Sequence, residues 1–128
     1  MTREELNKIS SIILDACITV HKEMGPGLLE SIYVLCLVYE LQKRGLLVKT
    51  EVSIPLQYRG VNLSKDFRID ILVEDEIILE IKAVENFLPV HHAQIISYLK
   101  LADKCLGFLI NFNVPVIKDG FKRFVNNF

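Results

Sequence analysis

The stretch "FRIDILVEDEIILEIKA", residues 67–83, decides how this chain folds and where its chemistry lies. It reads as two apolar strands joined by the acidic turn "EDE" at 74–76. Three charged residues interrupt the apolar runs: Asp70, Glu80 and Lys82. A charge buried in a sheet is costly unless it is paired or bound to a metal ion, so these three side chains need an explanation.

The alternation of side chains along a strand predicts which charges share a face. In the second strand, Glu80 and Lys82 fall on one face, and the other face carries Ile77, Leu79, Ile81 and Ala83. Asp70 lies opposite Glu80 if Val73 pairs with Ile77, a register that leaves a three-residue turn. We expect this register, or a bulge with the same effect. The β-carbons of the two acidic residues would then lie about 4.5–5.5 Å apart.

Two carboxylates at that separation can share one divalent cation. Mg²⁺ prefers oxygen ligands and keeps several waters, so two carboxylates and a backbone carbonyl form a suitable protein contribution. Without a cation the pair should repel, which raises the pKa of one carboxyl group. A lysine beside the cation can orient or deprotonate an attacking water and offset negative charge on a phosphate. The pattern therefore suits hydrolysis of a phosphodiester.

A structural alternative explains the same charges without any chemistry. Asp70 and Glu80 could be ordinary charges on a solvated sheet face, neutralised by Arg68 and Lys82. Against this, both strands are apolar almost throughout, which is typical of strands covered on both faces.

The composition predicts a single domain spanning residues 1–128. Of the 128 residues, 51 % are hydrophobic, and domains commonly contain roughly 100–150 residues. Charges interrupt every apolar run before the roughly 18–20 residues of a membrane span, so we expect no membrane segment. The start, "MTREELNKIS", has no basic region before an apolar stretch, so we expect a cytoplasmic protein. The three cysteines lack metal-binding spacing and should be small buried hydrophobes: Cys17, Cys36 and Cys105.

The charge balance limits how the chain can bind nucleic acid. With 15 basic and 16 acidic side chains, the net charge is −1. Any contact with nucleic acid must therefore come from a local patch or from bound metal ions. The high apolar content also suggests a self-association surface, and with it a homodimer.

The remaining chain predicts the order α, α, β, β, β, β, α, β. A first helix begins at Thr2 with a capping-box pattern and ends near Met24, where "GPG" at 25–27 breaks it. A second helix covers 28–44, and residues 46–60 form one strand or two short ones. Beyond the opening stretch we expect a helix over 90–104, a buried strand over 105–113, and an amphipathic basic and aromatic tail from Pro115.

Three motifs make the chain resemble the PD-(D/E)xK nuclease superfamily. "RID" at 68–70 followed by "EIK" at 80–82 resembles the D-(x)n-E-x-K signature, with Ile69 in place of the proline that can precede the aspartate. Gln94 and Tyr98 lie four residues apart and resemble the Q-x-x-x-Y motif of its exonuclease branches. "GLLESIY" at 27–33 is a G-x-x-E-x-x-Y segment, and the whole chain is similar to the small proteins named for it.

The resemblance implies an α/β fold with a restriction-endonuclease-like core, in which helices flank a central mixed sheet in the order α-β-β-β-α-β. It implies a metal site formed by Glu30, Asp70, Glu80 and the backbone carbonyl of Ile81, with Lys82 as the catalytic lysine. It also implies that Gln94 and Tyr98 brace the site or touch the nucleic-acid backbone.

Each supporting residue also has a structural interpretation. The helix dipole alone would favour Glu30 in the first helical turn by roughly 0.3–1 kcal/mol. Tyr33 shares its face and could support the site or only pack. His91 shares a face with Gln94, where it could contact a phosphate or simply lie in a solvated helix start. Gln94 and Tyr98 could be a polar pair at the edge of the core.

From these observations we expect an enzyme that hydrolyses phosphodiester bonds with Mg²⁺ or Mn²⁺, with DNA as its substrate. One alternative is a non-catalytic module that uses the nuclease fold for binding or dimerisation. A second is a metal-dependent hydrolase of a smaller phosphoester, which the weak basicity of the chain would suit.

Overall fold

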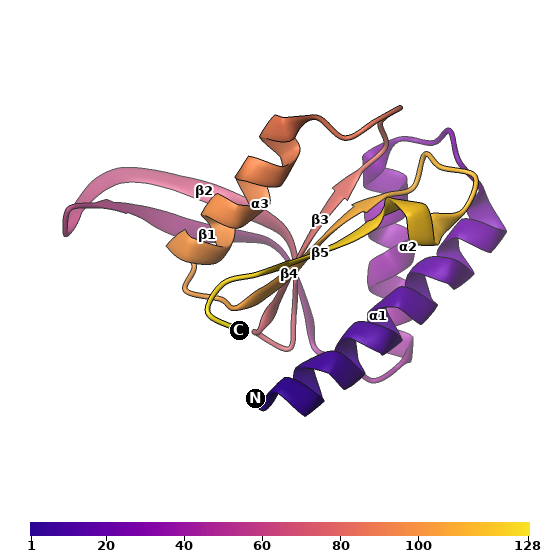
Figure 1. Ribbon diagram of the computed structural model, residues 1–128, viewed down its shortest axis with the longest axis horizontal. Coiled ribbons are helices and arrows are strands. Elements are labelled where there is room, and N and C mark those ends of the chain that lie inside the picture. The colour runs from indigo at the N-terminus through magenta and orange to yellow at the C-terminus, as the bar shows by residue number, and fades with distance from the viewer.

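The computed structural model describes residues 1–128 and contains three helices, a short 3-10 helix and a five-stranded mixed sheet (Figure 1). This α+β architecture agrees with the predicted fold class. The elements in chain order are α1 (Arg3–Met24), α2 (Glu30–Lys43), β1 (Val48–Tyr58), β2 (Val61–Val73), β3 (Ile77–Lys82), α3 (Pro89–Leu101), β4 (Leu106–Asn111), η1 (Ile117–Gly120) and β5 (Phe121–Val125).

Helix α1 begins as predicted. The Thr2 hydroxyl accepts a hydrogen bond from the Glu5 backbone N–H, and the Glu5 carboxylate accepts one from the Thr2 N–H, each at 3.1 Å. The apolar residues spaced along one face of the helix are all buried: Leu6, Ile9, Ile13, Cys17 and Val20. The helix ends at Gly25, whose φ of +66° suits a residue without a β-carbon.

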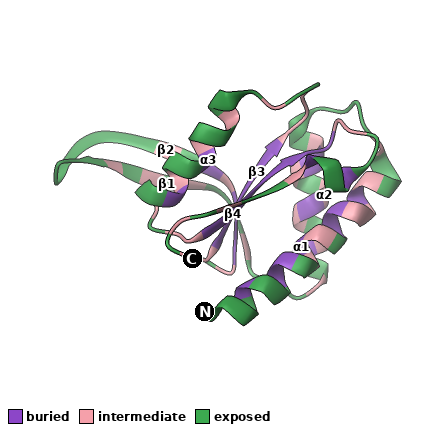
Figure 2. Cartoon of the chain, viewed as in Figure 1, coloured by how far each residue is buried: buried purple, intermediate pink, exposed green.

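The sheet has the order β1-β2-β3-β4-β5 and lies between two layers of helices. Strands β3 and β4 are parallel, joined by α3, and every other neighbouring pair is antiparallel. Helices α1 and α2 cover one face and α3 the other, with a separate apolar cluster on each side (Figure 1). The central strands are buried, as strands covered on both faces should be (Figure 2).

The predicted register of β2 and β3 is confirmed. Val73 pairs with Ile77, and the ladder continues through Leu72 and Ile78 to Ile71 and Leu79. The three-residue turn at 74–76 follows from this pairing. The last pair of this ladder is Ile71 with Leu79, so Asp70 is the first residue of β2 beyond the ladder.

The strand predicted within residues 46–60 is confirmed as a single strand, β1, whose register shifts between Pro55 and Gln57 at the edge of the sheet. One part of the chain differs from the sequence-based prediction. The segment after Pro115 is not a tail: β5 pairs with β4 and extends the sheet. The charged residues of this short strand, Lys122 and Arg123, are typical of a solvated tail, and its pairing with β4 is a contact that the local sequence does not reveal.

The β1–β2 hairpin changes face at Asp70. On one side of this point, Ile71 and Val73 pack with the core under α1 and α2. On the other, Ile69 and Phe67 pack with the cluster under α3, although strict alternation would keep all four on one face. Opposite Asp70 on β1, Glu51 has a φ of +49°, a conformation uncommon for a residue other than glycine. The hairpin therefore bends at Asp70 and extends away from the sheet (Figure 1).

None of the helices combines the length and the apolar character that crossing a membrane requires.

Candidate functional site

The site lies where β2 separates from β3, and we call Asp70 together with residues 80–82 the fork. Beyond the last backbone pair, the two carboxylates take over the role of backbone partners. The Asp70 N–H donates to Glu80 Oε2 at 3.0 Å, and the Ile81 N–H donates to Asp70 Oδ2 at 2.9 Å. Each carboxylate thus uses one oxygen for the neighbouring strand and keeps the other for a further ligand.

The backbone carbonyl of Ile81 points to the same side of β3. The Lys82 carbonyl accepts a hydrogen bond from the Phe112 N–H and so points toward β4. Polar backbone groups of successive residues in a strand point to alternate sides, and the Ile81 N–H points toward Asp70. The Ile81 carbonyl therefore points toward β2 beyond the end of the ladder, into the fork.

Glu80 is buried beside a like charge. Only 4 % of its surface is exposed, whereas Asp70 is half-buried. Burial, and next the negative charge of Asp70, raise the pKa of Glu80 from 4.5 to about 8, while the positive charge of Lys82 partly opposes the shift. The predicted rise in the pKa of one carboxyl group is confirmed in direction, with burial as its leading cause.

No cationic side chain neutralises the two carboxylates. Neither Lys82 nor Arg68 forms an ion pair with Asp70 or Glu80 within 4.0 Å. Arg68 is exposed, and it lies on the other side of the bend. The burial of Glu80 and the lack of these ion pairs both disfavour the solvated-face alternative.

The fork fits a divalent cation by the chemistry of its donors. Two adjacent carboxylates, each with an unused oxygen, and one backbone carbonyl supply hard oxygen ligands of the kind that Mg²⁺ and Mn²⁺ take. A cation would also relieve the repulsion that raises the pKa of Glu80. Mg²⁺ keeps several waters, so three protein oxygens are sufficient.

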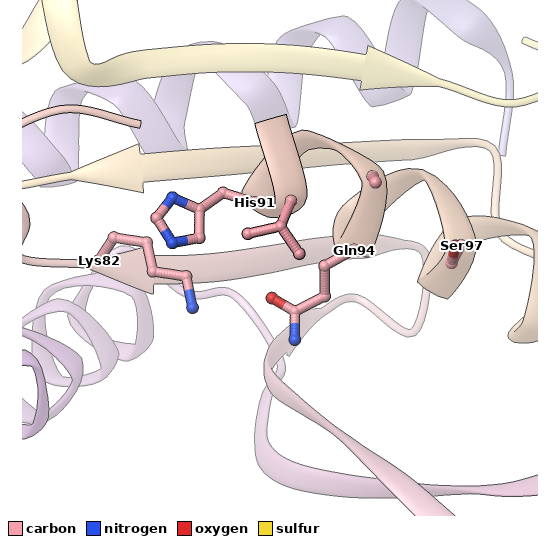
Figure 3. Close-up of a pocket in the computed structure, with 6 residues that line it drawn as sticks. Lys82, His91, Gln94 and Ser97 are labelled. Carbon is pink, nitrogen blue, oxygen red and sulfur yellow. The ribbon is translucent and has the colours of Figure 1, made fainter. Parts of the chain in front are cut away.

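A hollow of about 510 Å³ adjoins the fork on the α3 side, and its volume lies within the range of ligand sites. Its six lining residues are Lys82, Val90, His91, Ala93, Gln94 and Ser97. Figure 3 shows the Lys82, His91 and Gln94 side chains extending into the same space, one from β3 and two from α3. The predicted lysine thus faces two further hydrogen-bonding side chains.

The His91 ring is held in one orientation. Its Nδ1 accepts a hydrogen bond from the Leu88 N–H at 3.0 Å. In the neutral ring the proton must then be on Nε2, which leaves one N–H free to donate. This contact caps the start of α3, so the structural interpretation of His91 holds alongside the proposed contact with a phosphate.

Gln94 and Tyr98 form the predicted pair on one helical face. The Gln94 amide Nε2 donates to the Tyr98 hydroxyl at 3.0 Å. The Tyr98 ring stacks on Phe67 of β2, with ring centres 4.8 Å apart. Burial, and the negative charges of the fork, raise the pKa of Tyr98. The pair therefore links α3 to the hairpin immediately beside the carboxylates.

The two residues of the G-x-x-E-x-x-Y segment do not join the fork. Glu30 is exposed at the first turn of α2, and no three Asp, Glu, His or Cys side chains form a metal-binding group. Its neighbour Ser31 does line a groove that Asp70 also borders. Tyr33 is fully buried, which favours the packing interpretation: its hydroxyl donates to the Gly25 carbonyl at 2.6 Å and accepts from the Leu28 N–H, which braces the elbow before α2.

Sequence reasoning missed Asn111, at the end of β4. Its side chain is buried, donates to the Val84 carbonyl at 2.8 Å, and accepts from the N–H groups of Val84 and Asn113. These bonds fix the chain two residues after Lys82. The signal was available in the sequence, because Asn111 is the only strongly polar residue within the apolar run 106–112.

The comparisons with known proteins agree with this geometry. A family model described as the PD-(D/E)XK nuclease superfamily matches residues 7–124, which include every strand position of the fork and the whole of α3. No curated protein and no solved structure matches the chain. The match covers most of the chain, and the chain therefore belongs to the PD-(D/E)XK nuclease superfamily.

Proposed function

We propose that this protein is a metal-dependent nuclease that hydrolyses phosphodiester bonds, with DNA as its substrate. The observation that carries the proposal is the fork: two adjacent carboxylates, one of them buried, without a cationic partner and with a lysine beside them. Membership of a nuclease superfamily supports the reaction class.

Asp70, Glu80 and the carbonyl of Ile81 are the proposed ligands of Mg²⁺ or Mn²⁺. When bound, the cation would polarise a phosphate oxygen and lower the pKa of a coordinated water. Glu80 and Asp70 would hold it between the strands through their free oxygens. Glu30 is the proposed outer contact, because it precedes the groove residue Ser31.

Lys82 is the proposed catalytic residue on the substrate side. Its ammonium group extends into the hollow and has no ion-pair partner (Figure 3). There the ammonium group would orient the attacking water and offset the charge that builds on the phosphate, and as a neutral amine the same group would accept the proton of the water. The Gln94 amide and the free N–H of His91 would hold phosphate oxygens, while Tyr98 keeps Gln94 in place.

We propose that residues 1–128 act as one nuclease-like domain of the group named for G-x-x-E-x-x-Y, in the cytoplasm, and as a homodimer. The exposed apolar residues of α2 are consistent with self-association: Leu35 and Tyr39 are 71 % and 54 % exposed.

The test is cleavage of single- and double-stranded DNA by the wild type and by Glu80→Gln, with Mg²⁺, Mn²⁺ or EDTA. Glutamine can still accept the Asp70 N–H bond, so the fold should persist while the charge is lost. We expect cleavage that requires metal and disappears in the variant. The matched control is Glu85→Gln, since Glu85 is exposed and outside the fork. Metal binding without cleavage of any DNA would instead favour the non-catalytic module.

A further inference from the structure

The outer part of the β1–β2 hairpin, residues 52–69, projects from the sheet, and we call it the arm (Figure 1). Most of its residues are exposed (Figure 2). Only one of its sides packs on the protein: Val52, Ile54, Phe67 and Ile69 contact the cluster under α3. The remaining surface of the arm has no partner in the structure.

The arm carries a charge opposite to that of the rest of the chain. It contains three basic side chains and one acidic side chain, whereas the whole chain has 15 basic and 16 acidic ones. The three basic residues, Arg59, Lys65 and Arg68, are all exposed, and none forms an ion pair. A positive element on a slightly negative protein is a local site of attraction for a polyanion.

These cations form a series that leads away from the fork. Arg68 lies two residues from Asp70, Lys65 lies further out, and Arg59 occupies the turn at the tip. Val61 lies nine positions before Asp70, so at about 3.3 Å per residue the arm reaches roughly 30 Å from the fork. Tyr58, beside Arg59, is 61 % exposed and presents an aromatic face.

We infer that the arm binds the nucleic-acid strand outside the cleavage site, with Arg59, Lys65 and Arg68 contacting phosphates spaced along the strand and Tyr58 stacking on a base. This inference rests on the proposed function, because it assigns the strand that enters the fork to the arm. At about 3.4 Å per nucleotide of a stacked strand, the arm spans about nine nucleotides. It gives a nearly neutral protein the local basic surface that it otherwise lacks.

The test compares Arg59→Gln/Lys65→Gln with Lys8→Gln/Lys22→Gln, in which two exposed lysines of α1 are removed. Both variants lose two charges, and neither touches the fork. Affinity for DNA of about 20 nucleotides is measured in an Asp70→Asn background, which leaves the substrate intact. We expect the arm variant to bind about tenfold or more weakly, with the slope of log K against log salt reduced by about two, while the control changes by less than about twofold.

Hydrolysis of bis(p-nitrophenyl) phosphate separates this inference from the proposed function. This phosphodiester is too small to reach the arm, so we expect the arm variant to hydrolyse it at the wild-type rate. Equal DNA affinity and salt dependence in the arm and control variants would overturn the role of the arm, as would a wild type that binds no DNA. If the wild type hydrolyses neither substrate but the arm variant still binds DNA more weakly than the control variant, the proposed nuclease activity is overturned and the role of the arm stands.

Discussion

The β2–β3 pair is closed at one end and open at the other. At the closed end, Ile71, Leu72 and Val73 pair by backbone hydrogen bonds with apolar residues of β3, and all of them are buried. At the open end, the Asp70 and Glu80 carboxylates accept the backbone N–H groups that a continued ladder would have paired. The same two strands thus provide a rigid support and, one residue further on, a chemically active gap.

The two ends of the pair contribute to stability in opposite directions. The closed end gains from burial of apolar side chains. The open end places two carboxylates together, which burial and repulsion make unfavourable in the absence of a cation. A site of this kind is stable only because the adjoining ladder and core fix its backbone.

The largest effect should follow the removal of the lysine from the open end. Lys82→Met should lower DNA cleavage by about 10²–10⁴-fold, because a positioned group that moves the proton of the attacking water is lost. Lys100→Met, on the exposed side of α3, is the control. The measurement is the rate of DNA cleavage at saturating Mg²⁺. Cleavage by Lys82→Met at the wild-type rate would show that Lys82 has no role in the reaction.

A substitution at the closed end should lower the stability of the protein. Leu79 is fully buried in the larger apolar cluster, so Leu79→Ala should lower the free energy of unfolding by about 2–5 kcal/mol. Urea unfolding followed by circular dichroism measures the change. A loss below about 1 kcal/mol would mean that the closed end is not the support described here.

The pH dependence of stability should distinguish the two ends. With its pKa raised from 4.5 to about 8, Glu80 keeps a proton in the native state that it releases on unfolding. The contribution of Glu80 to the stability of the metal-free protein should therefore be fully present below pH 4.5 and fall as pH rises toward 8, by at most about 1.4 kcal/mol per pH unit.

Unfolding curves of the wild type and Glu80→Gln across this range, in EDTA, provide the check. The variant should lose most of the slope, and Glu85→Gln should keep it. A wild type whose stability rises over the same interval would contradict the assignment of the proton to Glu80.

Asn111 should show a smaller effect at the junction of β3 and β4. Asn111→Ala leaves the part-buried backbone groups of Val84 without their side-chain partners, at a cost of about 1–3 kcal/mol. If the segment after Lys82 is held by these bonds, its amide hydrogens should also exchange faster in the variant. Unchanged exchange would assign Asn111 to packing alone.

The smallest effect is expected at Glu30. Because this carboxylate is exposed and outside any three-ligand group, Glu30→Gln should change Mg²⁺ affinity by less than about tenfold, the lower limit typical of outer-shell partners of a metal. A complete loss of binding would show that α2 carries a direct ligand.

Much of the fold followed from local signals in the sequence. The capping box at Thr2, the "GPG" break and the acidic turn at 74–76 each act within a few residues, and each was predicted. The register of β2 and β3 followed because one pairing fixes all the others along a strand.

The parts that were missed depend on distant contacts. The bend at Asp70 arises where the hairpin passes from the apolar cluster under α1 and α2 to the cluster under α3. The alternation of apolar and polar residues in the sequence continues through the bend unchanged. Strand β5 exists because the edge of β4 is available to it. Glu30 fitted the motif, but the elbow held by Tyr33 sets the position of α2, and no local pattern reports how far the first helical turn lies from the fork.

The most direct measurement is calorimetric titration of Mg²⁺ and Mn²⁺ into the wild type and Asp70→Asn. Asparagine can still accept the Ile81 N–H bond, so the variant keeps the fork but loses one charge. We expect one cation bound by the wild type and at least about tenfold weaker binding by the variant. Equal binding by both proteins, or no binding by either, would contradict the claim that the two carboxylates form a metal site.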